Sequence, residues 1–152
     1  LQDEHSAGFG AQALGMLDHA EAWARTATGE DGRPRLADAE VRDRLARTAT
    51  DVEVSLLLQR RTAWMGEEGL PAEAEGPMAK LFSSESIVRR SEGLVELLGP
   101  DGLRSYFEPT APEGGRIEHA MRYSLGTTIY AGTSEVQRNI IAQRGLGLPR
   151  PS

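Results

Sequence analysis

The sequence contains no cysteine. Disulfides, thiolate nucleophiles and the cysteine ligands of zinc or iron–sulfur sites are therefore excluded. Its three histidines, His5, His19 and His119, lie far apart and show no metal-ligand spacing, so we predict no metal site. A cysteine-free sequence without a recognisable signal peptide is expected to be cytoplasmic.

An excess of basic residues is also missing. Lysine and arginine together number 17 against 23 acidic residues, which gives a net charge of -6 and a pI near 5.1. A nucleic-acid or anionic-membrane surface needs a basic stripe, so neither partner is expected. No apolar run approaches the roughly 20 residues that cross a membrane.

Strand signals are almost absent, and helical periodicity dominates instead. The spacing predicts long helices over residues 6–27, 36–65 and 78–98, followed by shorter ones over 117–123 and 134–144. The second helix carries the clearest apolar stripe and would be about 45 Å long, so it must pack along other long helices. The stripe comprises Val41, Leu45, Thr48, Val52, Leu56 and Ala63. We predict an all-α fold, an up-down four-helix-type bundle in which residues 1–152 form a single domain.

The last part of the sequence, Thr127 to Arg150, is the most specific: TTIYAGTSEVQRNIIAQRGLGLPR. A Gly-Thr-Ser corner is expected to break an extended stretch and to open an amphipathic helix. Ser134 with Gln137 three residues later has the pattern of a capping box. Gly145 and Pro149 are expected to close this helix.

This segment resembles the C-terminal signature of the FAD-dependent acyl-CoA dehydrogenases, whose Ile-Tyr-x-Gly-Thr-Ser turn lies against FAD and the acyl thioester. Shorter matches are 79–81 (Ala-Lys-Leu), 98–102 (Leu-Gly-Pro-Asp-Gly) and 122–125 (Arg-Tyr-Ser-Leu). The resemblance implies a C-terminal fragment of a larger enzyme that oxidises an acyl-CoA to the 2-enoyl-CoA. It further implies transfer of electrons to an electron-transfer flavoprotein, assembly as a homo- or hetero-oligomer, and inactivity of this fragment alone.

The resemblance also identifies a departure at the catalytic base. The family usually has a glutamate immediately before the Gly-Thr of the signature, and here that residue is Ala131. Ala131 has no ionisable group and cannot take the proton. Three interpretations are open: the carboxylate of Glu4 replaces it, a partner subunit carries the base, or a related flavoprotein needs no base here. A helical oligomerisation module that binds no flavin is the alternative from another class.

Three residues match cofactor-binding positions of the family. Thr133 and Glu135 match contacts with FAD near the pyrophosphate, where a helix N-terminus is suited to phosphate. Plain N-capping of the helix would by itself explain Ser134 and Gln137. Arg25 matches an arginine that holds the cofactor of a neighbouring subunit. The phenylalanine that usually follows that arginine is missing, Glu96 replaces a common glutamine, and Pro100 replaces a glycine.

Overall fold

The computed structural model describes residues 9–150. Within that range the chain contains helices and turns and no strand, apart from an isolated bridge between Thr28 and Pro34. The α-helices are α1 (Gly10–Thr26), α2 (Ala39–Glu67), α3 (Glu75–Leu98), α4 (Arg116–Thr127) and α5 (Ser134–Ile140). Short 3₁₀ turns lie at Arg35–Ala37, Gly99–Leu103 and Pro112–Gly115, and a π turn, Ile141–Gly145, continues α5.

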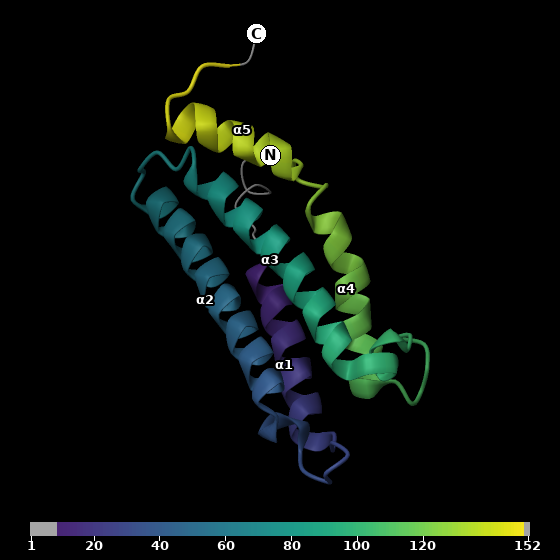
Figure 1. Cartoon of the computed structure of the whole chain (residues 1–152). Coiled ribbons are helices and arrows are strands. Elements are labelled where there is room, and N and C mark those ends of the chain that lie inside the picture. Colours follow the sequence, from purple (N-terminus) through teal and green to yellow (C-terminus); the bar gives the residue numbers. More distant parts are fainter. Residues whose placement is uncertain (1–8, 151–152) are drawn as a thin grey trace.

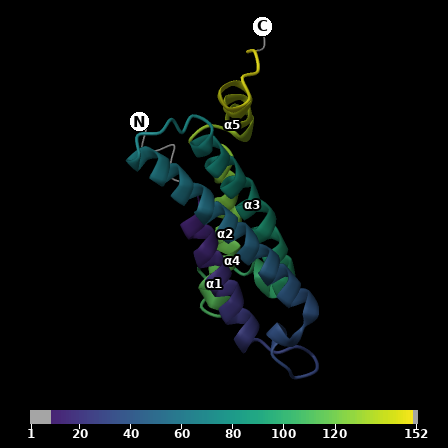
Figure 2. The same ribbon diagram turned by 90° about the vertical axis from the view of Figure 1, so that its left-hand side faces the viewer.

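Helices α1 to α4 run up and down along one long axis, and α5 lies across the end of the bundle where α3 begins (Figures 1 and 2). Helix α3 is central, because it packs against α2, α4, α5 and α1. An ion pair of 2.7 Å between Arg138 and Glu85 joins α5 to α3. The predicted all-α, up-down bundle is confirmed. No helix among the described residues is both long and apolar enough to cross a membrane.

The core explains why the helices approach closely. Its apolar part is made of aliphatic side chains from α1 to α4, such as Leu17, Val41, Ile87, Leu94 and Ile117, each at most 6% exposed. Burial of side chains of this size contributes about 1.5–3 kcal/mol each relative to exposure. Because α3 packs against all the other α-helices, the main stabilising contacts lie between α3 and its neighbours.

Small hydroxyl residues fill much of the remaining core. In α2, Thr48, Ser55 and Thr62 recur every seven residues and are buried. Each hydroxyl donates to the carbonyl four residues earlier, at 2.7 to 2.9 Å, so no hydrogen-bonding group is left unsatisfied. The predicted stripe therefore continues through Ser55, Thr62 and Met65, and its assignment of Ala63 was wrong because Ala63 is exposed.

Helix α3 shows the same composition on both of its packed sides. Ser83, Ser84, Ser86 and Ser91 are at most 3% exposed, and each hydroxyl bonds to a carbonyl of its own helix. Side chains this small let neighbouring helix backbones come close. Met78, at the start of this helix, is 42% exposed instead of buried.

The chain around the C-terminal signature differs from the expected extended stretch. Helix α4 continues to Thr127, four residues beyond its predicted end, and a compact turn follows. Thr127 is fully buried, and its hydroxyl donates to the carbonyl of Ser124 at 2.6 Å. This local bond satisfies a threonine whose β-branched side chain favours strands when judged by propensity alone.

Candidate functional site at the turn between α4 and α5

The signature turn, residues 128–133, connects the end of α4 to the start of α5. It begins with the N–H groups of Ile129 and Tyr130, which both donate to the carbonyl of Gly126 at 3.0 and 3.1 Å. Ala131 and Gly132 then take positive φ angles of 57° and 88°. A non-glycine residue with positive φ is uncommon, so the surrounding contacts must hold Ala131 in this conformation.

Two buried side chains supply those contacts. The Nζ of Lys80 donates to the carbonyl oxygen of Gly132 at 2.6 Å, and the Nε2 of Gln137 donates to that of Ala131 at 2.8 Å. Lys80 is 2% exposed and Gln137 is 5% exposed. Successive carbonyls of the turn are therefore fixed from α3 on one side and from α5 on the other.

The backbone N–H groups of the turn indicate which kind of ligand it can bind. The N–H groups of residues 131–133 find no acceptor among the described residues 9–150. Those of Ser134 and Val136, by contrast, donate to the Thr128 carbonyl at 3.1 Å and to the Thr133 hydroxyl at 3.3 Å. The donors left for a ligand lie in the turn itself, while the first turn of α5 is occupied internally.

Thr133 is the N-cap of α5, and its hydroxyl oxygen accepts from Val136. The predicted capping box of Ser134 and Gln137 was wrong, because the N-cap is Thr133. Ser134 is buried inside the first turn, and the Gln137 side chain reaches back to Ala131. The Thr133 oxygen acts as an acceptor here, and its O–H donates to the Glu135 carboxylate. Because a hydroxyl can rotate, this O–H can donate to a ligand oxygen only by leaving Glu135.

Glu135 lies beside Thr133 on the exposed start of α5. Its own backbone N–H and the Thr133 hydroxyl hold the pKa of the Glu135 carboxyl below its usual range. An ionised carboxylate accepts hydrogen bonds and repels a phosphate. Glu135 therefore suits the hydroxyl groups of a ribityl or ribose chain better than a pyrophosphate.

An aromatic cluster borders the turn. The ring of Tyr130 meets that of Phe9 edge-on at 5.7 Å and that of Tyr123 at 6.3 Å. Burial and the neighbouring Tyr123 hydroxyl raise the pKa of Tyr130 to about 12. Gly126 makes room for this arrangement, because a Cβ there would lie 2.8 Å from the Tyr130 ring.

The cluster continues as an exposed apolar surface. Tyr130 and Tyr123 are 42% and 45% exposed, and Ile129 is 66% exposed. Apolar side chains with a few convergent hydrogen-bond donors are the usual lining of cofactor and ligand sites. The donor set and the apolar surface together fit a flat ring system carrying carbonyl oxygens, such as a flavin.

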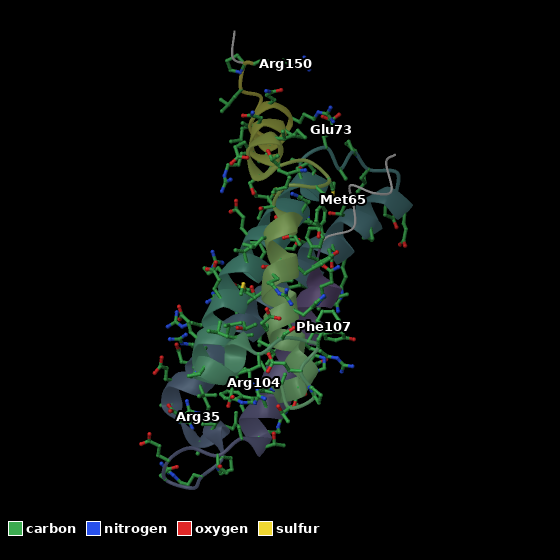
Figure 3. The ribbon with its side chains drawn as sticks, turned by 90° about the vertical axis from the view of Figure 1, so that its right-hand side faces the viewer. Arg35, Met65, Glu73, Arg104, Phe107 and Arg150 are labelled. Atoms are coloured by element: carbon green, nitrogen blue, oxygen red, sulfur yellow. The ribbon has the colours of Figure 1, made fainter. Side chains whose placement is uncertain are left out.

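Arg25 lies elsewhere. It is in the last turn of α1, where it pairs with Glu21 at 2.8 Å. A loop follows α1, and it is closed by a hydrogen bond of 2.8 Å from the N–H of Arg35 to the carbonyl of Ala27. Figure 3 places Arg35 at the end of the bundle opposite to Met65 and to Arg150 beyond α5.

The 17 residues of α1 span roughly 25 Å, which separates Arg25 from the signature turn. A hollow of about 480 Å³, lined in part by Asp31, Arg33 and Arg35, lies in the loop that follows α1. The structure therefore brings Thr133 and Glu135 together but does not bring Arg25 to them within one chain. Their contacts with a flavin remain predictions.

The predicted base, Glu4, lies outside the described residues. At the usual base position, Ala131 presents no carboxylate to the turn. No cluster of metal-ligating side chains occurs among residues 9–150. The sequence reasoning also missed Lys80 and Gln137 as anchors of the turn. A lysine flanked by Ala79 and Leu81 on a helix face was the available signal.

Known proteins that are similar to this chain identify its family. The family described as "Acyl-CoA dehydrogenase, C-terminal domain" matches residues 5–146. Acyl-CoA dehydrogenase FadE26 from Mycobacterium tuberculosis is 35% identical over 144 residues, covering 92% of this chain and 36% of the relative. An acyl-CoA dehydrogenase from Bacillus subtilis is 33% identical with the same coverage.

Two solved structures are similar over nearly the whole chain. The ChsE4–ChsE5 complex from Mycobacterium tuberculosis has a TM-score of 0.85 at 31% identity, covering 94% of this chain and 36% of that one. The Tcur3481–Tcur3483 steroid ACAD has a TM-score of 0.83 at 28% identity, covering 93% and 35%. The chain thus spans about a third of the length of these proteins. It belongs to the acyl-CoA dehydrogenase family and corresponds to the C-terminal domain of that family.

Proposed function

We propose that this chain is the C-terminal helical domain of a longer FAD-dependent enzyme that oxidises an acyl-CoA to the 2-enoyl-CoA. The observation that carries the proposal is the signature turn. It offers the three amides of residues 131–133 beside the exposed apolar surface of Tyr130 and Ile129. The domain covers only part of such a site, so we expect this chain alone to be inactive.

The residues of the turn would hold the cofactor from one side. The Thr133 hydroxyl and the free amides would donate to flavin or thioester oxygens, and the Glu135 carboxylate would accept from a sugar hydroxyl. Tyr123, Tyr130 and Ile129 would exclude water from the reacting carbons. When bound, FAD supplies the acceptor for the hydride.

The proton needs a carboxylate that Ala131 cannot supply. We propose Glu4 as the base, since some family members carry this residue at the start of the same domain. A carboxylate within reach of the carbon next to the thioester carbonyl is the requirement for this step. Changing Glu4 to Gln in the full-length protein should abolish the acyl-CoA-dependent loss of flavin colour. Unchanged bleaching would exclude Glu4.

A second candidate is a base-less subunit of a heteromeric flavoprotein. Two observations favour it: alanine occupies the usual base position, and one similar solved structure is the ChsE4–ChsE5 complex. In that case bleaching would require co-expression with a second, base-carrying subunit and would survive Glu4→Gln. The position of Arg25 also fits assembly, because from its end of the bundle it would serve the cofactor of another subunit.

The wider assignment follows from the same resemblance. We propose that the full-length enzyme acts in the cytoplasm on acyl-CoA intermediates of lipid metabolism, as a homo- or hetero-oligomer, and passes electrons to an electron-transfer flavoprotein. The test of the proposal is cofactor content. The full-length protein should purify with bound FAD, and a colourless protein that binds no added FAD would refute it. Size-exclusion chromatography with light scattering would report the assembly.

A further inference from the structure

Lys80 is an unusual core residue. Its side chain is 2% exposed, and no carboxylate among residues 9–150 lies within ion-pair distance of its ammonium group. The nearby acids Glu85 and Glu135 act on it only through longer-range charge, and Glu85 is paired with Arg138. Burial lowers the pKa of Lys80, which reflects the cost of keeping this charge away from water. A buried charge of this kind is rarely retained for packing alone.

Among residues 9–150, that ammonium group donates one hydrogen bond, and its acceptor lies in the signature turn. The Gly132 carbonyl, which accepts it at 2.6 Å, belongs to the same peptide group as the N–H of Thr133. That N–H has no acceptor among the described residues. A cation on the carbonyl oxygen of a peptide polarises the whole group and strengthens its N–H as a donor.

We propose that Lys80 is a positioning residue for the cofactor: its charge holds the Gly132–Thr133 peptide and strengthens the Thr133 N–H as a donor to a flavin oxygen. The inference rests on the proposed flavin-binding function and adds a residue to that site from the core of α3. Lys80 itself does not touch the ligand. It acts through one peptide group.

Gln137 provides a matched control. Like Lys80, it is more than nine-tenths buried and donates one hydrogen bond to a carbonyl of the same turn, that of Ala131. Its donor is a neutral amide. Methionine replaces either residue with an unbranched apolar side chain of similar length. The pair therefore separates the effect of the charge from the effect of losing one contact to the turn.

The experiment uses the full-length protein and two measurements on its flavin-free form: the dissociation constant for FAD by fluorescence quenching, and the melting temperature. Lys80→Met should weaken FAD binding by about tenfold and Gln137→Met by no more than about threefold, because a charge-assisted hydrogen bond is roughly twice as strong as a neutral one. The two substitutions should lower the melting temperature by similar amounts.

The outcomes that overturn the proposal are distinct. If Lys80→Met binds FAD like the wild type, or if both variants lose affinity in proportion to their loss of melting temperature, Lys80 has only a structural role. If Lys80→Met does not fold, Lys80→Gln, which keeps a neutral donor, replaces it: weakened binding supports the proposal, and wild-type affinity overturns it. A wild-type protein that does not bind FAD rejects the proposed function itself, and this inference with it.

Discussion

Replacing Gly132 by alanine tests how the signature turn is held. Gly132 has a φ of 88°, and a Cβ built there would lie 2.7 Å from the Nε2 of Gln137. The substitution therefore has two effects. It places a side chain in the left-handed region, and it forces the Gln137 side chain away from the Ala131 carbonyl, to which Nε2 now donates at 2.8 Å.

The size of each effect can be estimated separately. The left-handed conformation costs alanine about 1 kcal/mol relative to glycine. Loss of the Gln137 hydrogen bond costs about another 1 kcal/mol. Gly69 is the matched control, because its φ is 64° and nothing lies within 4 Å of a Cβ built there. We therefore expect Gly132→Ala to lower the free energy of unfolding by about 2 kcal/mol and Gly69→Ala by about 1 kcal/mol.

Urea denaturation of the chain, followed by circular dichroism, measures these differences, and a double-mutant cycle identifies their origin. In a Gln137→Ala background, where the hydrogen bond is already gone, Gly132→Ala should cost only about 1 kcal/mol. Two results would refute the reasoning: Gly132→Ala costing no more than Gly69→Ala, or the same cost in both backgrounds.

Two further predictions concern the backbone and the pH dependence. Gly102→Ala should destabilise the chain by about 2 kcal/mol or more, because its Cβ would clash with the Val95 carbonyl oxygen, which belongs to the backbone and cannot move aside. Gly93 lies inside α3, and a Cβ there would meet only the end of the Arg44 side chain, at 3.8 Å. Gly93→Ala should be neutral or stabilising in the same denaturation experiment. The folded state lowers the pKa of Lys80, so just below pH 10.5, its ordinary pKa, the unfolded chain binds more protons than the folded one. The free energy of unfolding should therefore rise with pH in this window, and Lys80→Met should remove the rise. The pKa of Tyr130 is raised to about 12, so the unfolded chain loses that proton first and stability should fall from about pH 10 towards 12, a fall that Tyr130→Phe should reduce. Urea midpoints across this pH range check both signs, and a wild-type profile identical to that of both variants would contradict them.

The helical architecture could be predicted because apolar spacing and strong end signals agree along most of the chain. Gly99 illustrates this: it directly follows the predicted end of the third helix at residue 98, and it ends α3 with a φ of 61°. The core could be predicted only in part. Periodicity reasoning looks for apolar residues, whereas Ser55, Ser83 and Ser91 are fully buried and satisfy their hydroxyl groups on their own helices.

The candidate site, like the core, could be predicted from the sequence only in part. The signature located the turn, and Thr133 is its helix cap. Two side chains give the turn its shape. Lys80 donates to the carbonyl of Gly132, 52 residues later in the sequence. Gln137 donates to the carbonyl of Ala131, whereas the sequence had predicted that it would cap α5. Long-range contacts of this kind leave no periodic signal in one sequence, because they depend on how α3 and α5 pack.

The central claim is that the signature turn forms part of a flavin and acyl-CoA site. Anaerobic addition of acyl-CoA to the purified full-length protein, with the absorption spectrum of its flavin recorded, tests this claim most directly. We predict one bound FAD per site and bleaching of its visible absorption by an acyl-CoA substrate, with the 2-enoyl-CoA as product. Bound flavin that no acyl-CoA reduces, alone or with a base-carrying partner subunit present, would contradict the account.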